Sequence, residues 1–375
     1  MMEIRTITAG AREADIERAA QAARQAREQL SAAGYTVQTL RLALSATGAN
    51  RCGDFASIAQ GYEAQALAAG FDYVAISVGD TERLAALPAA IAATEALFAS
   101  APLTSPEGQL RPDMIAGAAA AMAAIGARTA NGFGNLRFAA AAMVGPGSPF
   151  FPAAAHDGGA PWLAVGPEAA ALAVEATAEM GSGVSVAHAP AHLTALIEQH
   201  DTRIRAVLDG LEATTGVRFA GCDWSLAPHP DPARSVGAAI EALAGVPFGA
   251  WGTLAGVRAL TAAIRAAQVT QLGFSGVMLP VLEDATLAQR NAEGRYTLRD
   301  LLAFSAVCGT GLDTIPLAGD TTPAQITGVL AEVATLAVAL RKPLTARLLP
   351  IPGLAAGDMT TFDFPYFVNT RVMVL

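Results

Sequence analysis

The sequence predicts a mainly parallel α/β fold, and three observations carry that prediction. Short apolar runs typical of strands alternate with longer segments of helical periodicity along the chain. Of the 375 residues, 53% are hydrophobic and 15% are charged, so much of the chain must be buried in a core or a subunit interface. Neither a linker nor an internal repeat of roughly 20–50 residues divides it. We therefore expect a single α/β domain over residues 1–375.

In the N-terminal half, the predicted strands and helices alternate in order. The strands are residues 4–8, 36–44, 73–77 and 138–144. The helices are residues 14–33, 54–69, 81–100 and 113–127. Gly34 supplies the left-handed conformation that ends the first helix. Loops containing proline and glycine are predicted at residues 101–112 and 145–161.

The C-terminal half continues the same alternation. Its predicted strands are residues 162–165, 184–187, 219–226, 277–282, 314–317 and 344–350. Its predicted helices are residues 167–180, 191–215, 235–243, 254–267, 298–309 and 323–341. Pro323 suits the first position of the last helix, and Thr321 or Thr322 can cap it.

The charge and composition argue against several classes of partner. The formal net charge is −9 and no basic stripe appears, whereas nucleic-acid binding requires clustered cations. The apolar runs are interrupted by glycine, proline and charges, so none supplies the about 20 strongly apolar residues of a membrane span. The start lacks the apolar core of a signal peptide. The three cysteines show no C-x-x-C spacing, which fits a reducing compartment. We expect a cytoplasmic protein.

Lys342 is the only lysine among the 24 basic residues of the chain. A bias toward arginine replaces lysine on a solvated surface, but not where a compact, titratable amine is required. Lys342 is therefore a candidate functional residue. The alternative is that it complements the C-terminal dipole of the long apolar helix that it follows.

The glycine- and proline-rich loop at residues 145–161 contains a second candidate. It presents His156 beside Asp157, a pair able to transfer protons or bind a metal. The alternative is a compact surface loop without a chemical role.

Residues 219–226 place two polar side chains on one face of a predicted strand. The two-residue period sets Cys222, Trp224 and Leu226 on one side and Asp223 and Ser225 on the other. If the first face is core, the second points toward a cleft at the strand end, where parallel sheets hold their ligands. The alternative is a solvent-facing edge strand.

Two further segments carry acidic residues after predicted strands or loops. Glu283 and Asp284 follow the predicted strand 277–282 and suit a divalent cation or proton transfer. Cys308 precedes a glycine loop, with Asp313 and Asp320 beyond it. Cys308 is a candidate nucleophile, although an inert buried thiol is the alternative because no base lies near it in sequence.

These segments together resemble a known family. The matching pieces are IRTIT near the start, SPFFPAAAHDG at 148–158, DWSLAPHP at 223–230, GFSGVMLPVLED at 273–284, SAVCGTGLDTIPLAGDT at 305–321, KPLTARLLP at 342–350 and GDM at 357–359. Their order and spacing are similar to those of domain of unknown function 711, also called uncharacterised protein family 0210. The resemblance spans nearly the whole chain and is tightest from about residue 219 onward.

The resemblance implies a particular α/β architecture. In fold, that family is similar to pyruvate formate-lyase and anaerobic ribonucleotide reductase, which form a ten-stranded α/β barrel of two half-barrels with a central finger loop. Those enzymes use a finger cysteine and a C-terminal glycyl radical. Cys308 is the position that resembles the finger cysteine, but the tail FDFPYFVNTRVMVL contains no glycine. We therefore expect the barrel without radical chemistry.

The resemblance also extends to individual residues. The family has the same residue types at Arg5, His156, Asp223, Ser225, Glu283, Asp284, Cys308, Asp313, Asp320, Lys342 and Arg347. This chain departs from the family pattern at Ala250-Trp251-Gly252, where Trp251 stands in place of a histidine of the family. The departure marks this chain as a divergent branch.

The expected function is an enzyme, of hydrolase or lyase class, acting on a small anionic metabolite. Proton transfer or nucleophilic chemistry would fall to Asp223, Asp313, His156, Lys342 and Cys308. Substrate binding would fall to Arg5, Arg347, Ser225 and Ser275. A divalent cation would sit at Glu283, Asp284 and Asp320. The alternative is a non-catalytic protein that binds or senses a small ligand; in both cases we expect a homo-oligomer.

Overall fold

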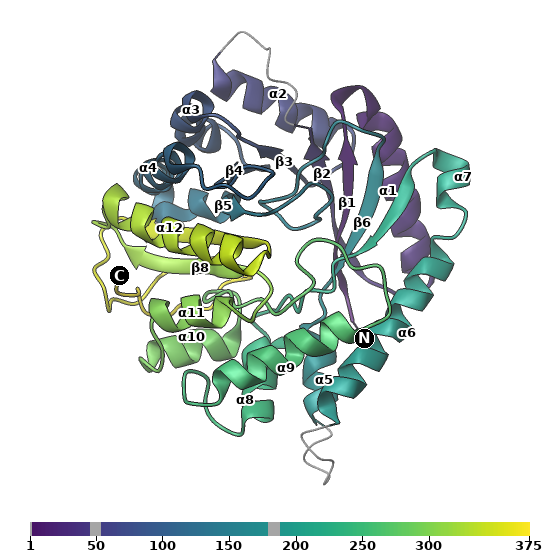
Figure 1. Cartoon of the computed structure of the whole chain (residues 1–375). Coiled ribbons are helices and arrows are strands. Elements are labelled where there is room, and N and C mark those ends of the chain that lie inside the picture. The colour runs from purple at the N-terminus through teal and green to yellow at the C-terminus, as the bar shows by residue number, and fades with distance from the viewer. Residues whose placement is uncertain (1, 46–53, 179–187) are drawn as a thin grey trace.

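In the computed structural model of the protein, residues 2–45, 54–178 and 188–375 are described. Cys52 and the predicted strand at residues 184–187 lie outside these ranges. The described chain confirms the predicted α/β class: helices form the outer shell and the strands lie inside it (Figure 1).

A nine-stranded mixed sheet has the order β7-β6-β1-β2-β3-β4-β5-β9-β8. Its strands are β1 (Ile4–Ala11), β2 (Val37–Leu44), β3 (Tyr73–Ser77), β4 (Leu97–Pro102), β5 (Phe138–Ala142), β6 (Trp162–Pro167), β7 (Arg218–Cys222), β8 (Gly311–Ala318) and β9 (Leu344–Ile351). Strands β1 to β5 pair in parallel. Antiparallel pairs join β1 to β6 and β5 to β9. Strands β6 and β7, and strands β8 and β9, also pair in parallel. The two antiparallel pairs therefore divide the sheet into three parallel blocks.

Residues 277–282 do not form one of the named strands, so that prediction was wrong. Isolated bridges pair Cys222 with Gln271 and Leu226 with Val277, and another pairs Pro280 with Asp313. All three bridges are parallel. Residues 271–280 thus run between β7 and β8 without the continuous ladder of a strand.

The helices cover the outer face of the sheet (Figure 1). The α-helices are α1 (Ile16–Ala32), α2 (Phe55–Ala68), α3 (Thr81–Ala92), α4 (Pro112–Arg128), α5 (Ala170–Ala178), α6 (Ala189–Val207), α7 (Leu211–Thr215), α8 (Val236–Ala244), α9 (Thr253–Ala266), α10 (Ala285–Ala292), α11 (Leu298–Ser305) and α12 (Pro323–Leu340). The 3-10 helices are η1 (Glu13–Asp15), η3 (Ala130–Arg137) and η5 (Pro232–Arg234). The predicted cap of α12 is Thr322, which forms a capping box with Gln325.

Three further elements differ from the sequence-based prediction. The predicted strand at 219–226 ends as β7 at Cys222, so residues 223–225 lie in the loop beyond it and not on one face of a strand. The predicted helix at 81–100 ends at Ala92, and its remainder contains β4, whose run LFASAP is alanine-rich and therefore lacks the β-branched signal of a strand. Helix α10 was missed. Its start is fixed by Asp284, whose carboxylate accepts hydrogen bonds from the backbone N–H groups of Thr286 and Leu287.

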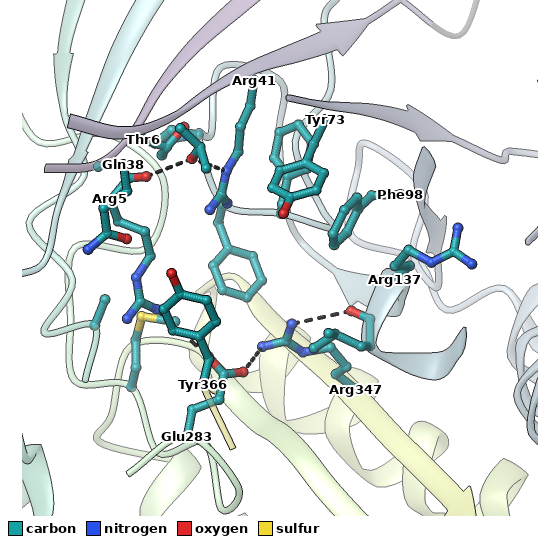
Figure 2. A pocket seen from close by; sticks show the side chains of 18 of the residues that line it. Arg5, Thr6, Gln38, Arg41, Tyr73, Phe98, Arg137, Glu283, Arg347 and Tyr366 are labelled. Atoms are coloured by element: carbon teal, nitrogen blue, oxygen red, sulfur yellow. Dashed lines mark hydrogen bonds and ion pairs between the residues drawn. The ribbon is translucent and has the colours of Figure 1, made fainter. Parts of the chain in front are cut away.

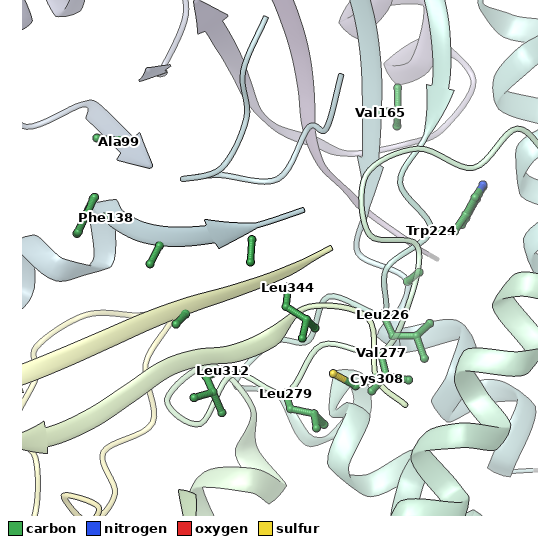
Figure 3. Close-up of a cluster of buried hydrophobic side chains, with 14 of the residues drawn as sticks. Ala99, Phe138, Val165, Trp224, Leu226, Val277, Leu279, Cys308, Leu312 and Leu344 are labelled. Atoms are coloured by element: carbon green, nitrogen blue, oxygen red, sulfur yellow. The ribbon is translucent and has the colours of Figure 1, made fainter. Parts of the chain in front are cut away.

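The two-residue alternation of the strands separates the core from the inner side of the sheet. In β2, Leu40 and Leu42 are buried in the main hydrophobic core, which places Thr39 and Arg41 on the opposite face. In β9, Leu348 belongs to the core and Arg347 faces inward. Figure 3 shows core side chains contributed by distant segments, including Trp224, Leu279 and Leu344.

Helix α12 is the one helix in the described ranges that is long and apolar enough, by length and composition, to cross a membrane. It packs against α4, β5 and β9. Ile326, Leu330 and Val333 are fully buried on its inner face. These contacts make α12 a covering helix of the sheet.

Candidate active site

A cavity of about 300 Å³ lies on the inner side of the sheet. Its walls come from β1, β2, β3, β4, β6, β9 and η3 and from five loop regions, so strands on both sides of each antiparallel pair contribute (Figure 2). The polar lining residues are Arg5, Thr6, Gln38, Thr39, Arg41, Tyr73, Glu95, Arg137, Asp223, Glu283, Arg347 and Tyr366. The apolar lining includes Phe98, Phe133, Leu136, Phe150, Phe151, Met278 and Phe364.

Arg41 projects from β2 into this cavity (Figure 2). Its Nε donates to the hydroxyl of Thr39 at 2.9 Å, and its guanidinium lies 5.7 Å from the ring centre of Tyr73 and 5.3 Å from that of Phe151. In the described part of the chain, it forms no ion pair with a carboxylate. Burial lowers the pKa of Arg41 to about 10, with Arg5 adding to the effect, so it remains charged at neutral pH. Arg41 therefore offers a partly buried cation without an ion-pair partner to a ligand.

Arg347 binds two acidic residues that the chain brings from different segments. Its Nε donates to Asp313 at 2.6 Å and its Nη2 donates to Glu283 at 2.8 Å. A third hydrogen bond reaches the carbonyl of Leu136 at 3.3 Å. The three charged side chains are almost completely buried, with side-chain exposures of 7% for Arg347, 0% for Asp313 and 14% for Glu283. This is a buried ion-pair network, with Glu283 at the cavity wall.

Asp313 and Glu283 share the cation Arg347, but their hydrogen-bonding capacity is unequally satisfied. Burial raises the pKa of Glu283, and the nearby Asp313 raises it further, against the opposing effect of Arg347. The Oδ2 of Asp313 is buried with no hydrogen-bond partner among the described residues. Thr314, which follows, has φ +42°, a left-handed conformation that is strained for a β-branched residue. A register shift in β8 at this point directs Asp313 toward Arg347.

Arg5 completes the charged wall from β1. It lies 3.4 Å from Glu168 and 3.7 Å from Glu283, and it also donates to the carbonyl of Pro228. Glu168 is itself bound by Gln38 at 2.8 Å and by Arg234 at 3.0 Å. The charge of Arg5 is thus shared between carboxylates of the protein.

Aromatic side chains form the remaining walls. Phe98 contacts Tyr73 and Phe151 edge-to-face, with ring centres 5.2 and 5.4 Å apart. A second cluster contains Phe133 and Phe364, 5.1 Å apart, and continues to Tyr366. Tyr366 also lines the cavity (Figure 2). The cavity therefore combines a cationic end with flat apolar walls.

Asp223 lines the cavity, but its carboxylate is occupied by protein groups. Its Oδ1 accepts hydrogen bonds from the backbone and hydroxyl of Ser225 and from the backbone of Ser275, and its Oδ2 accepts one from the backbone of Phe274. Burial raises the pKa of Asp223. The hydroxyl of Ser275 donates to the carbonyl of Leu272. These three predicted site residues join residues 223–225 to residues 273–275.

His156 does not line the cavity. Its Nδ1 accepts a hydrogen bond from the backbone of Gly158 at 3.0 Å, and its Nε2 lies 3.2 Å from the carbonyl of Ala160. A neutral ring protonated at Nε2 satisfies both contacts. Both contacts lie within the same loop, so His156 has a structural role there.

Lys342 lies outside the cavity lining, buried at the end of another helix. Its Nζ donates to the carbonyls of Ser305 at 2.8 Å and Ala306 at 3.4 Å, and to the carbonyl of Cys308. Ser305 and Ala306 end α11, where carbonyls lack partners within the helix, and Cys308 lies in the turn that follows. The dipole interpretation therefore matches the geometry, although the helix is α11 rather than α12. The thiol of Cys308 is free and fully buried nearby.

Replacing Lys342 with methionine is expected to lower the free energy of unfolding by about 2–3 kcal/mol, because three buried carbonyls lose their charged donor. Chemical denaturation followed by circular dichroism measures this change. Arg299→Met, at an exposed position of α11, is the control and should change stability by under about 0.5 kcal/mol. Loss of ligand affinity without loss of stability would contradict this structural role.

The three residues predicted to hold a metal are not brought together. Glu283 faces the cavity, whereas Asp284 is fully buried and binds Ser235 and the first turns of α8 and α10. Asp320 is exposed after β8. Within the described ranges, no group of three His, Cys, Asp or Glu side chains has the arrangement of a metal site.

Sequence reasoning missed Arg41, Tyr73, Phe98 and Tyr366. A usable signal existed for Arg41, because a charged residue interrupts the apolar run of a predicted buried strand. The three aromatic residues gave no comparable signal in the sequence, since phenylalanine and tyrosine are common in strands.

The comparisons with known proteins give one family. A family described as "Uncharacterised ACR (DUF711)" matches residues 2–363. A "UPF0210 protein" of Pyrobaculum islandicum is 33% identical over 304 residues, covering 77% of this chain and 64% of the relative. One from Desulforudis audaxviator is 33% identical over 301 residues, covering 76% and 64%. One from Pyrobaculum arsenaticum is 42% identical over 147 residues, covering 38% and 33%. The chain thus spans less than two thirds of the length of these relatives.

Proposed function

The chain belongs to the uncharacterised DUF711 family, and we propose that it is an enzyme that acts on a small anionic metabolite in the cavity. The proposed chemistry is non-radical acid/base catalysis of hydrolase or lyase type. The observation that carries the proposal is Arg41, a partly buried guanidinium without a carboxylate partner in the described chain, in the same cavity as Glu283.

In this proposal, each charged residue has a separate task. Arg41 binds the carboxylate or phosphate group of the substrate through its terminal nitrogens. Glu283 transfers a proton, because it lines the cavity and its pKa is raised by burial and by Asp313. Arg347 holds Glu283 in place and Asp313 orients Arg347.

The same fold supports a finer architectural proposal. Residues 271–280 bridge β7 on one side and β8 on the other, which would complete a second five-stranded parallel half and close the sheet. We propose that this arrangement is a ten-stranded barrel of two half-barrels, similar to that of pyruvate formate-lyase. We also propose, from composition, a cytoplasmic homo-oligomer.

A second candidate function is a non-catalytic ligand-binding protein. It is favoured by the saturation of Asp223 and His156 with internal hydrogen bonds and by the position of Lys342 outside the cavity. Glu283→Gln separates the two functions once the co-purified ligand has been identified by mass spectrometry of denatured protein. An enzyme should lose turnover of that compound and retain binding, whereas a binding protein turns nothing over in either form.

Arg41→Met is expected to weaken binding of small anions by about 30- to 100-fold, the loss of roughly 2–3 kcal/mol from a charge-assisted hydrogen-bond pair. Isothermal titration calorimetry with acetate and with inorganic phosphate measures this change. Arg295→Met, at an exposed arginine between α10 and α11, is the matched control and should bind both anions as the unaltered protein does. Equal anion binding by Arg41→Met and the control would refute the proposal.

A further inference from the structure

We propose that the substrate of this cavity is an aromatic monocarboxylate: one planar ring joined by a short chain to a single carboxylate. The inference rests on the proposed function, because it names the class of anion that Arg41 receives. Three properties of the cavity support it: its charge balance, its ring-lined walls and its size.

The charge balance favours one negative charge. Among the four arginines of the lining, Arg5 is shared by Glu168 and Glu283, and Arg347 is bound by Glu283 and Asp313. Arg137 donates to the carbonyls of Ile91 and Leu97 and to the hydroxyl of Thr94. Arg41 is left as the cation whose terminal nitrogens have no acceptor in the described chain. One planar guanidinium matches one carboxylate in a bidentate pair.

A phosphate dianion fits this environment poorly. Many phosphate sites lie at the N-terminus of a helix, where free backbone N–H groups converge. No described lining residue of the cavity belongs to the first turn of an α-helix. The neighbouring Glu283 would also repel a second negative charge, and it already competes for Arg347 and Arg5.

The walls favour a planar ring in the rest of the ligand. The Arg41 guanidinium lies 5.7 Å from the ring centre of Tyr73 and 5.3 Å from that of Phe151, and Phe98 contacts both rings edge-to-face. The cluster of Phe133, Phe364 and Tyr366 also lines the cavity. Offset and edge-to-face contacts of this kind select an aromatic group over an aliphatic one.

The size limits how large that ligand can be. The volume of about 300 Å³ is at the lower end of the range for small-molecule sites, which is about 300–1,000 Å³. It is suited to one ring with a short acidic side chain and is small for a nucleotide or a dinucleotide cofactor.

Isothermal titration calorimetry on the full chain with four probes tests the inference. The probes are 3-phenylpropionate, its neutral amide, propionate and phenyl phosphate. We expect 3-phenylpropionate to bind at least about tenfold more tightly than each of the other three probes. The amide lacks the charge, propionate lacks the ring, and phenyl phosphate carries a second negative charge. Tighter binding of phenyl phosphate, or equal binding of propionate and 3-phenylpropionate, would overturn the inference.

Two variants distinguish its failure from failure of the proposed function. Phe98→Leu should weaken 3-phenylpropionate by about two- to tenfold and leave propionate unchanged, because it removes a ring and keeps an apolar side chain. Phe304→Leu, in an aromatic cluster outside the cavity lining, is the matched control and should alter neither affinity. If both carboxylates bind with equal affinity and Arg41→Met weakens both, the proposed aromatic substrate class is wrong and the proposed anion site is supported. If none of the four probes binds, both fail.

Discussion

Replacing Arg347 with methionine is expected to lower the free energy of unfolding by about 3–5 kcal/mol, the range observed when one partner of a buried ion pair is removed. The substitution keeps an unbranched apolar stem in place but leaves Asp313 and Glu283 buried without their shared cation. One oxygen of Asp313 already lacks a partner among the described residues, so the site has no spare donor to compensate. Urea denaturation monitored by circular dichroism gives the change directly.

The double variant Arg347→Met with Asp313→Leu is the informative comparison. Removing the orphaned carboxylate together with its cation should restore part of the lost stability, whereas independent effects would add. Additive losses would show that the ion pair is not the source of the destabilisation.

The same variant should show a pH dependence with a defined sign. Burial and Asp313 raise the pKa of Glu283 in the folded protein, and loss of Arg347 raises it further. A carboxyl whose pKa is higher in the folded than in the unfolded state stabilises the fold at low pH, and this contribution is lost as the pH rises through the folded-state pKa. The stability deficit of Arg347→Met should therefore be smaller at about pH 5 than at about pH 8.

The strands were largely predictable from the sequence, and the inner face of the sheet was not. Alternation and apolar density located β1, β2, β3 and β5 to within a few residues. Two of the charged residues at the site, Arg5 and Arg347, were also identified, through the family resemblance. Arg41 was missed because single-sequence patterns do not show which cations will find carboxylate partners in the fold.

The acidic candidates separate for a related reason. Glu283 and Asp284 are neighbours, but Asp284 caps α10 and Glu283 faces the cavity. Asp223 resembles a catalytic carboxylate in sequence, yet four hydrogen bonds from two loops occupy it. Two of these hydrogen bonds come from residues about fifty positions away in the sequence. Sequence spacing alone therefore could not show whether Asp223 is a structural or a catalytic carboxylate.

Replacing Gly276 with alanine is expected to destabilise the protein by about 3 kcal/mol or more, at the upper end of the range for overpacking a buried site. A Cβ atom at Gly276 would lie 2.4 Å from the Cα of Gly309 and 3.0 Å from its nitrogen. Both neighbours are main-chain atoms, so no side chain can rotate to relieve the clash. The two glycines mark the crossing of the segments GFSGV and CGTGL, where the backbone of Gly309 donates to the carbonyl of Val277 at 2.8 Å.

This crossing connects the fold to the site. Residues 273–275 bind Asp223, and the chain beyond Gly309 leads directly into β8 and Asp313. Separating the two segments should therefore weaken anion binding as well as stability. Gly328→Ala is the matched control: it is exposed in α12 with no atom within 4 Å of the added Cβ, and should stabilise the protein by about 0.5–1 kcal/mol. Similar denaturation midpoints for the two variants would show that the segments can move apart, and that close approach at Gly276 does not position Asp313.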